Sequence, residues 1–475
     1  MQVYIHTLGC PKNEVDSEWM ASLLLRSGHS IVADPSRADA IVVNTCGFVE
    51  TARSESIEWL RRYTKLKRDV SRKRHRRHDR GKNGGVISRS TGQGPAVVAA
   101  GCLAQRYGQR LLQEIPDLSG VLGSLRWSEI ERCLREVTEG GRPCWTGPAR
   151  EEPPVARLLR GPSVYLKIAD GCSTRCAFCA IPQIKGPLRS RPRAEIVAEA
   201  CELARRGATE IVLVAQDTTA YGLDRGEKDG LATLIEEIAE NVPDLLWLRI
   251  LYAHPEHLSP RLLQVMASIP MVVKYLDLPL QHAHPAVLAR MARPVQDLLR
   301  VVSDIRAAVP SIALRSTFIV GYPGETDEEF DSLLSFLCEA KLDRVGAFVY
   351  SPEEGTLAAT LDNQVEEGIK LQRYDLLMRV QQLVSLARNR EFVGQELDVL
   401  VESDELPRER RKSLGERGGF GRSYRDAPEI DGLVYFGTGG LTTPVNRGSL
   451  LSVRITGAEE YDLVGEAVKP TLSRA

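Results

Sequence analysis

The sequence predicts a multidomain α/β chain with an N-terminal parallel α/β sheet domain, a central partial (β/α) barrel and a small C-terminal antiparallel β-barrel. Two series of apolar strand patterns alternate with amphipathic helical patterns, which is typical of parallel sheets. After about residue 390 the strand patterns follow one another without helices, which favours an antiparallel barrel. The length of 475 residues also exceeds what one ordinary core supports, so several domains are expected.

The N-terminal domain is predicted over residues 1–145, with a basic insertion over about 64–94. A first amphipathic helix is expected in EVDSEWMASLLLRSG, and a second after Gly47, before the insertion. Apolar strands that alternate with such helices form βαβ units, which implies a parallel sheet. The predicted strands are VYIHT, AIVVNT and AVVAAG.

One basic run dominates the charge pattern. Arg61–Lys82 holds twelve Lys or Arg and two Asp, a net of +10, while the whole chain has a net charge of −1, so the remainder sums to −11. An acidic remainder disfavours general binding to phosphate backbones and favours a basic partner. We expect the basic run to be a solvated, disordered insertion, with contact to RNA as the alternative.

The central barrel is predicted over residues 158–390, after a linker rich in Pro and Gly. Thr326 and Glu329 fit a capping box that opens the helix after GYPGE. Six repeated βα units favour a full or partial parallel barrel. The predicted strands are VYLKIA, EIVLVA, LLWLRILY, VVKYLDL, ALRSTFIVG and RVGAFVY.

The C-terminal β-barrel is predicted over residues 391–469. It is acidic, because Gln395–Lys469 holds fourteen acidic and ten basic residues, a net of −4. Turns separate its strands, and no helical pattern lies between them. The predicted strands are ELDVLVE, GLVYF, LLSVRI and YDLVGEAV.

The sequence indicates a cytoplasmic protein. No apolar run is long enough to span a bilayer, and the first residues lack the basic and then apolar pattern of a signal peptide. In the cytosol thiols stay reduced, so clusters among the ten cysteines suggest metal or redox chemistry rather than disulfides.

Three cysteines lie directly after the predicted strand VYLKIA, with the spacing C-x3-C-x2-C: Cys172, Cys176 and Cys179. In a parallel barrel this places them at the carboxyl ends of the strands, where active sites lie. Three thiolates can hold three irons of a [4Fe–4S] cluster and leave the fourth iron open to a small ligand. The alternative is a structural zinc site that a distant Cys or His completes.

Three further cysteines, Cys10, Cys46 and Cys102, are distant in sequence, yet each comes at the end of a predicted strand. The carboxyl ends of parallel strands share one edge of the sheet, so these side chains are expected to converge. We interpret them as the ligands of a second cluster with an open iron. The alternative is three unrelated buried cysteines.

The C-x3-C-x2-C loop on a βα barrel resembles the radical S-adenosylmethionine (SAM) superfamily. The resemblance implies that SAM chelates the open iron and is cleaved to methionine and a 5′-deoxyadenosyl radical, which abstracts hydrogen from an unactivated carbon. Gln216, Arg315 and Gly321, at or near predicted strand ends, are the candidate SAM contacts, with barrel packing as the alternative. The sequence identifies no catalytic side chain.

The two cysteine trios together resemble the methylthiotransferases of that superfamily, whose domain order matches nearly the whole chain. The resemblance implies an auxiliary [4Fe–4S] cluster on Cys10, Cys46 and Cys102 that provides sulfur, and a C-terminal TRAM β-barrel. It also implies that SAM serves both as radical source and as methyl donor. The product is a methylthio group on carbon, and an electron donor such as a flavodoxin or ferredoxin is implied.

Several strings resemble the branch of this family that modifies the β-carbon of an aspartate in ribosomal protein S-twelve. Charge favours the same partner, because an acidic β-barrel attracts a basic protein. The alternative is the branch that methylthiolates tRNA adenosines. Two departures are the insertion before Cys102 and Ser173, where the family often has Asn. The matching strings are LGCPKNEVDSE, AQDTTAYGLD, YLDLPLQHAHPAVLARMARP, FIVGYPGET, FVYSPEEGT and APEIDGLVYF.

Overall fold

The computed structural model describes residues 1–78, 94–148, 157, 161–293, 297–439, 441 and 444–472, without the side chains of 68–78 and 469–472. The chain forms two compact units. Unit 1 is Met1–Leu158 together with Ala180–Pro187, and unit 2 is Leu159–Cys179 together with Leu188–Ala475. Unit 2 therefore contains both the central sheet and the C-terminal barrel. No described helix is both long and apolar enough to cross a membrane.

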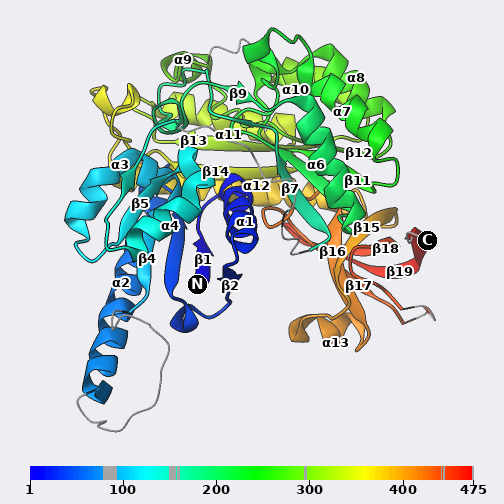
Figure 1. Cartoon of the computed structure of the whole chain (residues 1–475). Coiled ribbons are helices and arrows are strands. Elements are labelled where there is room, and N and C mark those ends of the chain that lie inside the picture. Colours follow the sequence, from blue (N-terminus) through cyan, green and yellow to red (C-terminus); the bar gives the residue numbers. More distant parts are fainter. Residues whose placement is uncertain are drawn as a thin grey trace. The chain divides into compact units, whose positions relative to one another are not determined.

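Unit 1 is built on a six-stranded sheet in the order β2-β1-β3-β4-β5-β6, and all its strand pairs are parallel (Figure 1). The three predicted strands are confirmed as β1, β3 and β4. The strands are β1 (Gln2–Thr7), β2 (Ser30–Ile31), β3 (Ala40–Thr45), β4 (Ala96–Ala100), β5 (Gly120–Gly123) and β6 (Cys144–Trp145). The helices are α1 (Pro11–Arg26), α2 (Glu50–His78), α3 (Gly101–Glu114), α4 (Ile130–Thr138) and α5 (Ile181–Lys185).

The basic run differs from the prediction over its first part. Helix α2 continues to His78, so Arg61–His78 is helical and the expectation of disorder is wrong there. Lys and Arg are good helix formers, and the sequence has neither Gly nor Pro between Glu50 and His78 to end the helix earlier. Residues 79–93 of the predicted insertion lie outside the described residues.

Unit 2 contains a six-stranded parallel sheet in the order β7-β10-β11-β12-β13-β14, whose described ladders do not join β14 back to β7. The six predicted strands are confirmed, and the barrel is partial. The strands are β7 (Ser163–Lys167), β10 (Glu210–Val214), β11 (Trp247–Ile250), β12 (Val272–Asp277), β13 (Ala313–Val320) and β14 (Arg344–Val349). Strand β8 (Ala169–Asp170), which follows β7 in sequence, forms a small antiparallel pair with β9 (Arg189–Ser190).

The helices of unit 2 pack on the sheet through one large apolar core. The strands read as almost continuous apolar runs because a parallel sheet is covered on both faces. The predicted capping box at Thr326 and Glu329 is confirmed at the start of α11. The helices are α6 (Arg193–Arg205), α7 (Gly230–Asn241), α8 (Pro260–Ser268), α9 (Pro285–Arg290), α10 (Leu298–Ala308), α11 (Asp327–Ala340) and α12 (Glu367–Arg390).

The C-terminal strands form a closed barrel in the order β15-β16-β17-β19-β18. The barrel is mixed rather than wholly antiparallel, because β17 and β19 pair in parallel. The prediction missed β16, whose sequence GGFGRS lacks strand formers. Glycine is needed there: a Cβ at Gly419 would lie 2.1 Å from the Ser403 carbonyl oxygen. The strands are β15 (Glu396–Ser403), β16 (Gly418–Ser423), β17 (Val434–Gly437), β18 (Leu450–Ala458) and β19 (Leu463–Leu472), with α13 (Arg411–Leu414) between the first two.

A buried ionic group joins the central sheet to the β-barrel inside unit 2. Glu210, at the start of β10, has no exposed surface. It accepts hydrogen bonds from Arg249 at 2.7 Å and from Arg422 of β16 at 2.5 Å. Burial alone would raise the pKa of Glu210, but the charges of Arg422 and Arg249 outweigh it and lower the pKa to about 2. The carboxylate is therefore ionised at neutral pH and balances two buried cations.

Replacing Glu210 with Gln is expected to weaken unit 2 strongly, because Arg249 would stay buried without its counter-charge and Arg422 would keep only its pair with Glu402. Breaking a buried ion pair in this way typically costs about 3–5 kcal/mol. Hydrogen exchange of the β10 and β16 amides measures the change in opening free energy. The control is Glu396→Gln, which removes the exposed pair with Arg454 and should cost less than about 1 kcal/mol. Equal effects of the two substitutions would contradict the role of Glu210 as a buried counter-charge.

Candidate functional site

The C-x3-C-x2-C loop of unit 2 begins directly after β8. It is held by backbone hydrogen bonds: the Ala177 N–H donates to the Met291 carbonyl at 2.9 Å, and the Ala358 N–H donates to the Ala177 carbonyl at 2.9 Å. Cys172, Cys176 and Cys179 are all half-buried, so their thiols are neither sealed in the core nor fully in solvent. The loop is thus fixed by its backbone while its three thiols stay accessible.

Charged groups surround this loop. Burial raises the pKa of Cys172, hydrogen bonds from Thr174 oppose the rise, and the negative charges of Asp217 and Cys176 add to it. Arg293 donates from Nη1 to the Cys176 Sγ at 3.4 Å and from Nη2 to the Pro279 carbonyl at 2.8 Å. A raised thiol pKa means that metal binding releases protons, since the ligand form is the thiolate.

The second trio lies in unit 1 at the carboxyl ends of three neighbouring strands. Cys10 follows β1 and is the N-cap residue of α1, Cys46 follows β3, and Cys102 lies in the first turn of α3, directly after β4. The sheet order β1-β3-β4 places these strand ends side by side. The backbone therefore brings together the three strand ends as predicted.

Glycines next to these cysteines allow the loops to approach closely. Gly9 has a φ of +94°, and a Cβ there would lie 2.8 Å from the Cys46 Cβ and 3.2 Å from its Sγ. A Cβ at Gly47 would lie 3.1 Å from the Cys102 carbonyl carbon. The cysteine loops of β1, β3 and β4 are therefore packed against one another, and larger residues at these positions would push them apart.

Asn13 links the three loops and was missed in the sequence. Its Nδ2 donates to the Leu8 carbonyl at 2.8 Å and to the Thr45 carbonyl at 3.1 Å, and its Oδ1 lies 3.9 Å from the Cys102 Sγ. The side chain is fully buried. One feature of the sequence indicates this role. Asn13 lies three residues after Cys10, in the first turn of α1, where side chains reach the neighbouring strand ends.

The spacing of the thiols bears on the choice between zinc and an iron–sulfur cluster. Among the described residues, one group of three or more possible ligands has all its ligand atoms within 4.8 Å of one another, and it contains no cysteine. A single zinc ion, with Zn–S bonds of about 2.3 Å, holds its sulfur ligands within about 4.6 Å of one another. No three cysteine thiols among the described residues therefore have the spacing of a preformed zinc site.

The three candidate SAM contacts have different surroundings. Gln216, after β10, donates from Nε2 to Asp170 at 2.9 Å, while its Oε1 is buried without a hydrogen-bond partner among the described residues. Arg315 is engaged by Asp277 at 2.7 Å and by Asp431 at 3.4 Å. Gly321 has a φ of +72°, and a Cβ there would lie 2.2 Å from the Lys370 Cγ. Gln216 thus has a polar atom to offer, whereas protein contacts already occupy Arg315 and Gly321.

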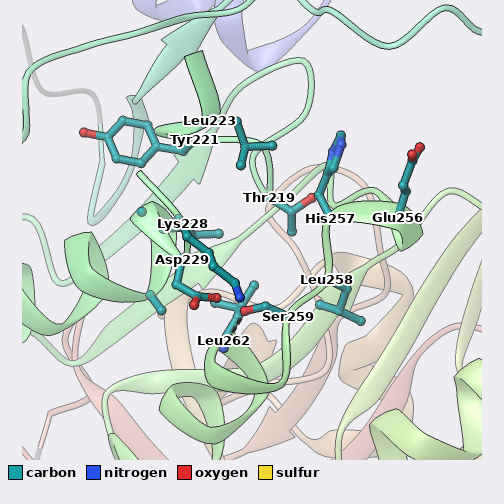
Figure 2. Close-up of a pocket in the computed structure, with 13 residues that line it drawn as sticks. Thr219, Tyr221, Leu223, Lys228, Asp229, Glu256, His257, Leu258, Ser259 and Leu262 are labelled. Atoms are coloured by element: carbon teal, nitrogen blue, oxygen red, sulfur yellow. Dashed lines mark hydrogen bonds between the residues drawn. The ribbon is translucent and has the colours of Figure 1, made fainter. Parts of the chain in front are cut away.

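A cluster of Asp217, His254 and His257, absent from the sequence predictions, lies at the same strand ends. One ligand atom from each lies within 4.8 Å of the others. His257 Nδ1 hydrogen-bonds Asp217 Oδ2 at 2.7 Å. His257 also lines a pocket of about 200 Å³ with Thr219, Glu256 and others (Figure 2). The sequence contains an indication of this cluster, because Asp217 follows β10 and the two histidines follow β11 within a few residues.

Three family matches cover most of the chain. Residues 2–123 match Uncharacterized protein family UPF0004, residues 166–337 match the Radical SAM superfamily, and residues 393–468 match the TRAM domain. Among solved structures, the radical S-adenosylmethionine methyltransferase TsrM from Kitasatospora setae matches with a TM-score of 0.53 and 14% identity over 75% of this chain and 77% of that chain. The cobalamin-dependent radical enzyme OxsB matches with a TM-score of 0.51 and 12% identity over 81% of this chain and 56% of its own. At these identities the two structures show the fold alone.

Curated relatives match over nearly the whole length. The ribosomal protein uS12 methylthiotransferase RimO of Chloroflexus aurantiacus is 43% identical, over 98% of this chain and 100% of the relative. The protein of the same name from Moorella thermoacetica is 42% identical, over 98% of this chain and 99% of the relative. The chain therefore belongs to the RimO family of ribosomal protein uS12 methylthiotransferases, within the radical SAM superfamily.

Proposed function

We propose that the chain attaches a methylthio group to the β-carbon of an aspartate in ribosomal protein uS12, the S-twelve protein of the small subunit. The observation that carries the proposal is the convergence of the strand ends that bear Cys10, Cys46 and Cys102, in a chain that also contains a C-x3-C-x2-C loop. A radical enzyme that also inserts sulfur needs two such sites. The full-length relatives bear the name of this reaction.

The two trios are proposed to hold two [4Fe–4S] clusters, the SAM-binding one on Cys172, Cys176 and Cys179 and the auxiliary one on Cys10, Cys46 and Cys102. When bound, the clusters and SAM supply hydrogen abstraction, a sulfur atom and a methyl group. Superfamily membership implies SAM and iron–sulfur chemistry.

The residues of the chain orient these groups. Arg293 donates to the Cys176 Sγ, so it fixes one ligand and places a positive charge beside the loop. The unpaired Oε1 of Gln216 is an acceptor suited to the ammonium group of SAM. Asn13 holds the Cys10, Cys46 and Cys102 loops in register through its three contacts. Arg315 and Gly321 remain candidates for SAM contacts, although their present contacts favour a structural role.

Three partners complete the proposal. The β-barrel, with a net charge of −4 over Gln395–Lys469, would attract a basic ribosomal protein and repel tRNA phosphates. The part of the basic run over Arg61–His78 is helical, which suits contact with ribosomal RNA when uS12 is bound in the small subunit. A flavodoxin or ferredoxin would deliver the electron.

The test is a reaction of the anaerobically reconstituted enzyme with SAM, a reductant and purified uS12. We expect peptide mass spectrometry to find a methylthio group in place of one hydrogen on a single aspartate. Whole small subunits are tested in parallel, and a basic-run contact predicts that their modification falls more steeply with salt than that of free uS12. Unmodified tRNA serves as the competing substrate: methylthiolated adenosine with unchanged uS12 would overturn the proposal.

A further inference from the structure

His254 carries a buried hydrogen-bond donor that no described group satisfies. It is the N-cap residue of a short 3₁₀ helix, η4 (Pro255–His257), and its Nδ1 accepts the Glu256 N–H at 3.2 Å. Because Nδ1 accepts, the neutral ring carries its proton on Nε2. The residue is 8% exposed, and its Nε2 has no hydrogen-bond partner in the described part of the chain. An unpaired buried N–H is rare and costly, and it calls for an acceptor.

The ring is uncharged at neutral pH. Burial lowers the pKa of His254 to about 4, and the nearby charge of Arg293 contributes to the lowering. The neighbouring carboxylate of Asp217 accepts from Thr219 Oγ1 at 2.7 Å, from the Ala220 N–H at 3.1 Å and from His257 Nδ1 at 2.7 Å, but not from His254. The Nε2–H of His254 is therefore buried without an acceptor among the described residues, and it feels the positive charge of Arg293.

A metal ion suits this cluster less well than an acceptor does. In His254 the Nδ1 lone pair is engaged by the Glu256 N–H, which leaves the proton on Nε2, and His257 Nδ1 is bound to Asp217. A metal bound at His254 Nε2 would have to remove that proton and break the helix cap. A hydrogen-bond acceptor needs neither change, and the positive charge of Arg293 favours an anionic one.

The location connects this donor with the reaction. Asp217 follows β10 and its charge raises the pKa of Cys172, while Arg293 contacts Cys176 and its charge acts on both His254 and His257. His254 follows β11, at the same edge of the sheet. His257, three residues further along the chain, lines the pocket of about 200 Å³ (Figure 2). The donor thus lies next to the loop where the radical chemistry is proposed.

We propose that the Nε2–H of His254, beside Arg293, binds a carboxylate brought to the radical-cluster edge and so positions the reacting molecule. The proposal rests on the proposed function, because two molecules in that reaction carry a carboxylate: the target aspartate of uS12 and SAM. The target aspartate is the first source to test, since its carboxylate is attached to the carbon that reacts.

The test is His254→Asn in the reconstituted full chain. Asn is a favoured N-cap residue whose oxygen can still accept the Glu256 N–H, but it is too short to replace Nε2. We expect kcat/KM for methylthiolation to fall about 10- to 100-fold, the loss typical of a hydrogen bond to a charged group. His284→Asn is the matched control: His284 caps α9 in the same way, with Nδ1 accepting the Ala286 N–H at 3.3 Å, but its side chain is 33% exposed. The control should leave kcat/KM unchanged.

The two carboxylate sources give different results. A raised KM for a uS12 peptide, with unchanged KM for SAM and unchanged 5′-deoxyadenosine formation without peptide, assigns the target aspartate. A raised KM for SAM assigns the SAM carboxylate. Equal kinetics of His254→Asn and wild type overturn the proposal, as does zinc or iron that binds at this cluster in wild type and is lost in His254→Asn. Failure of the wild-type enzyme to modify the peptide at all would instead count against the proposed function.

Discussion

Cys102→Ala is expected to abolish methylthiolation of uS12 while 5′-deoxyadenosine formation from SAM continues. Cys102 lies directly after β4, 3.9 Å from the Asn13 Oδ1, in the group of loops that also carries Cys10 and Cys46. Without it the auxiliary cluster keeps two protein ligands, whereas the loop of Cys172, Cys176 and Cys179 in unit 2 is untouched. Iron and sulfide analysis should fall from about eight to about four of each per chain.

The control for this substitution is Cys144→Ala in the same unit. Cys144 lies on β6 at the edge of the sheet and pairs with Val121 of β5, away from the three cysteine-bearing strand ends. We expect the iron content and product yield of Cys144→Ala to match those of wild type. If Cys102→Ala retained full iron and full product, Cys102 would be an ordinary buried residue and the auxiliary site would be misassigned.

Cys176→Ala is expected to abolish both SAM cleavage and product formation, so that neither activity can be detected. Cys176 accepts from Arg293 at 3.4 Å, and its backbone carbonyl accepts the Cys179 N–H at 3.1 Å, so it lies at the centre of the loop. Its loss leaves two ligands for the SAM-binding cluster. Reductant-dependent 5′-deoxyadenosine formation, measured by liquid chromatography, reports the effect directly.

About four irons should remain in Cys176→Ala, because unit 1 keeps its own trio. Cys338→Ala, an exposed position on α11, serves as the control and should cleave SAM at the wild-type rate. Residual SAM cleavage by Cys176→Ala above that of a protein-free reaction would show that the radical chemistry does not depend on this loop.

The convergence of the strand ends that carry Cys10, Cys46 and Cys102 was predictable because its signal is local. Each of these three cysteines comes shortly after an apolar run, and parallel strands necessarily bring their carboxyl ends to one edge. Gln216 was chosen by the same rule, because it follows a predicted strand. Its Oε1 has no hydrogen-bond partner among the described residues. Arg315 obeys the rule equally well, yet it is occupied by Asp277 and by Asp431 from the C-terminal part of the chain. No local pattern reveals a partner more than a hundred residues away.

What the sequence concealed depends on long-range contacts or on glycine. Strand β16 has a composition that disfavours strands, and it forms because its glycines let neighbouring carbonyl groups come within reach. Asn13 and His254 are inconspicuous polar residues in sequence; their importance comes from buried contacts that the fold creates. The helical part of the basic run has another explanation: Lys and Arg are good helix formers, so a high local charge does not by itself prevent a helix.

Mössbauer spectroscopy of the anaerobically reconstituted wild-type chain tests the central claim most directly. Two three-cysteine sites predict two [4Fe–4S] clusters, each with one iron that lacks a protein thiolate, and addition of SAM should change the signal of one such iron only. A spectrum with a single cluster, or two clusters that SAM leaves unchanged, would contradict the assignment of Cys10, Cys46 and Cys102 together with Cys172, Cys176 and Cys179.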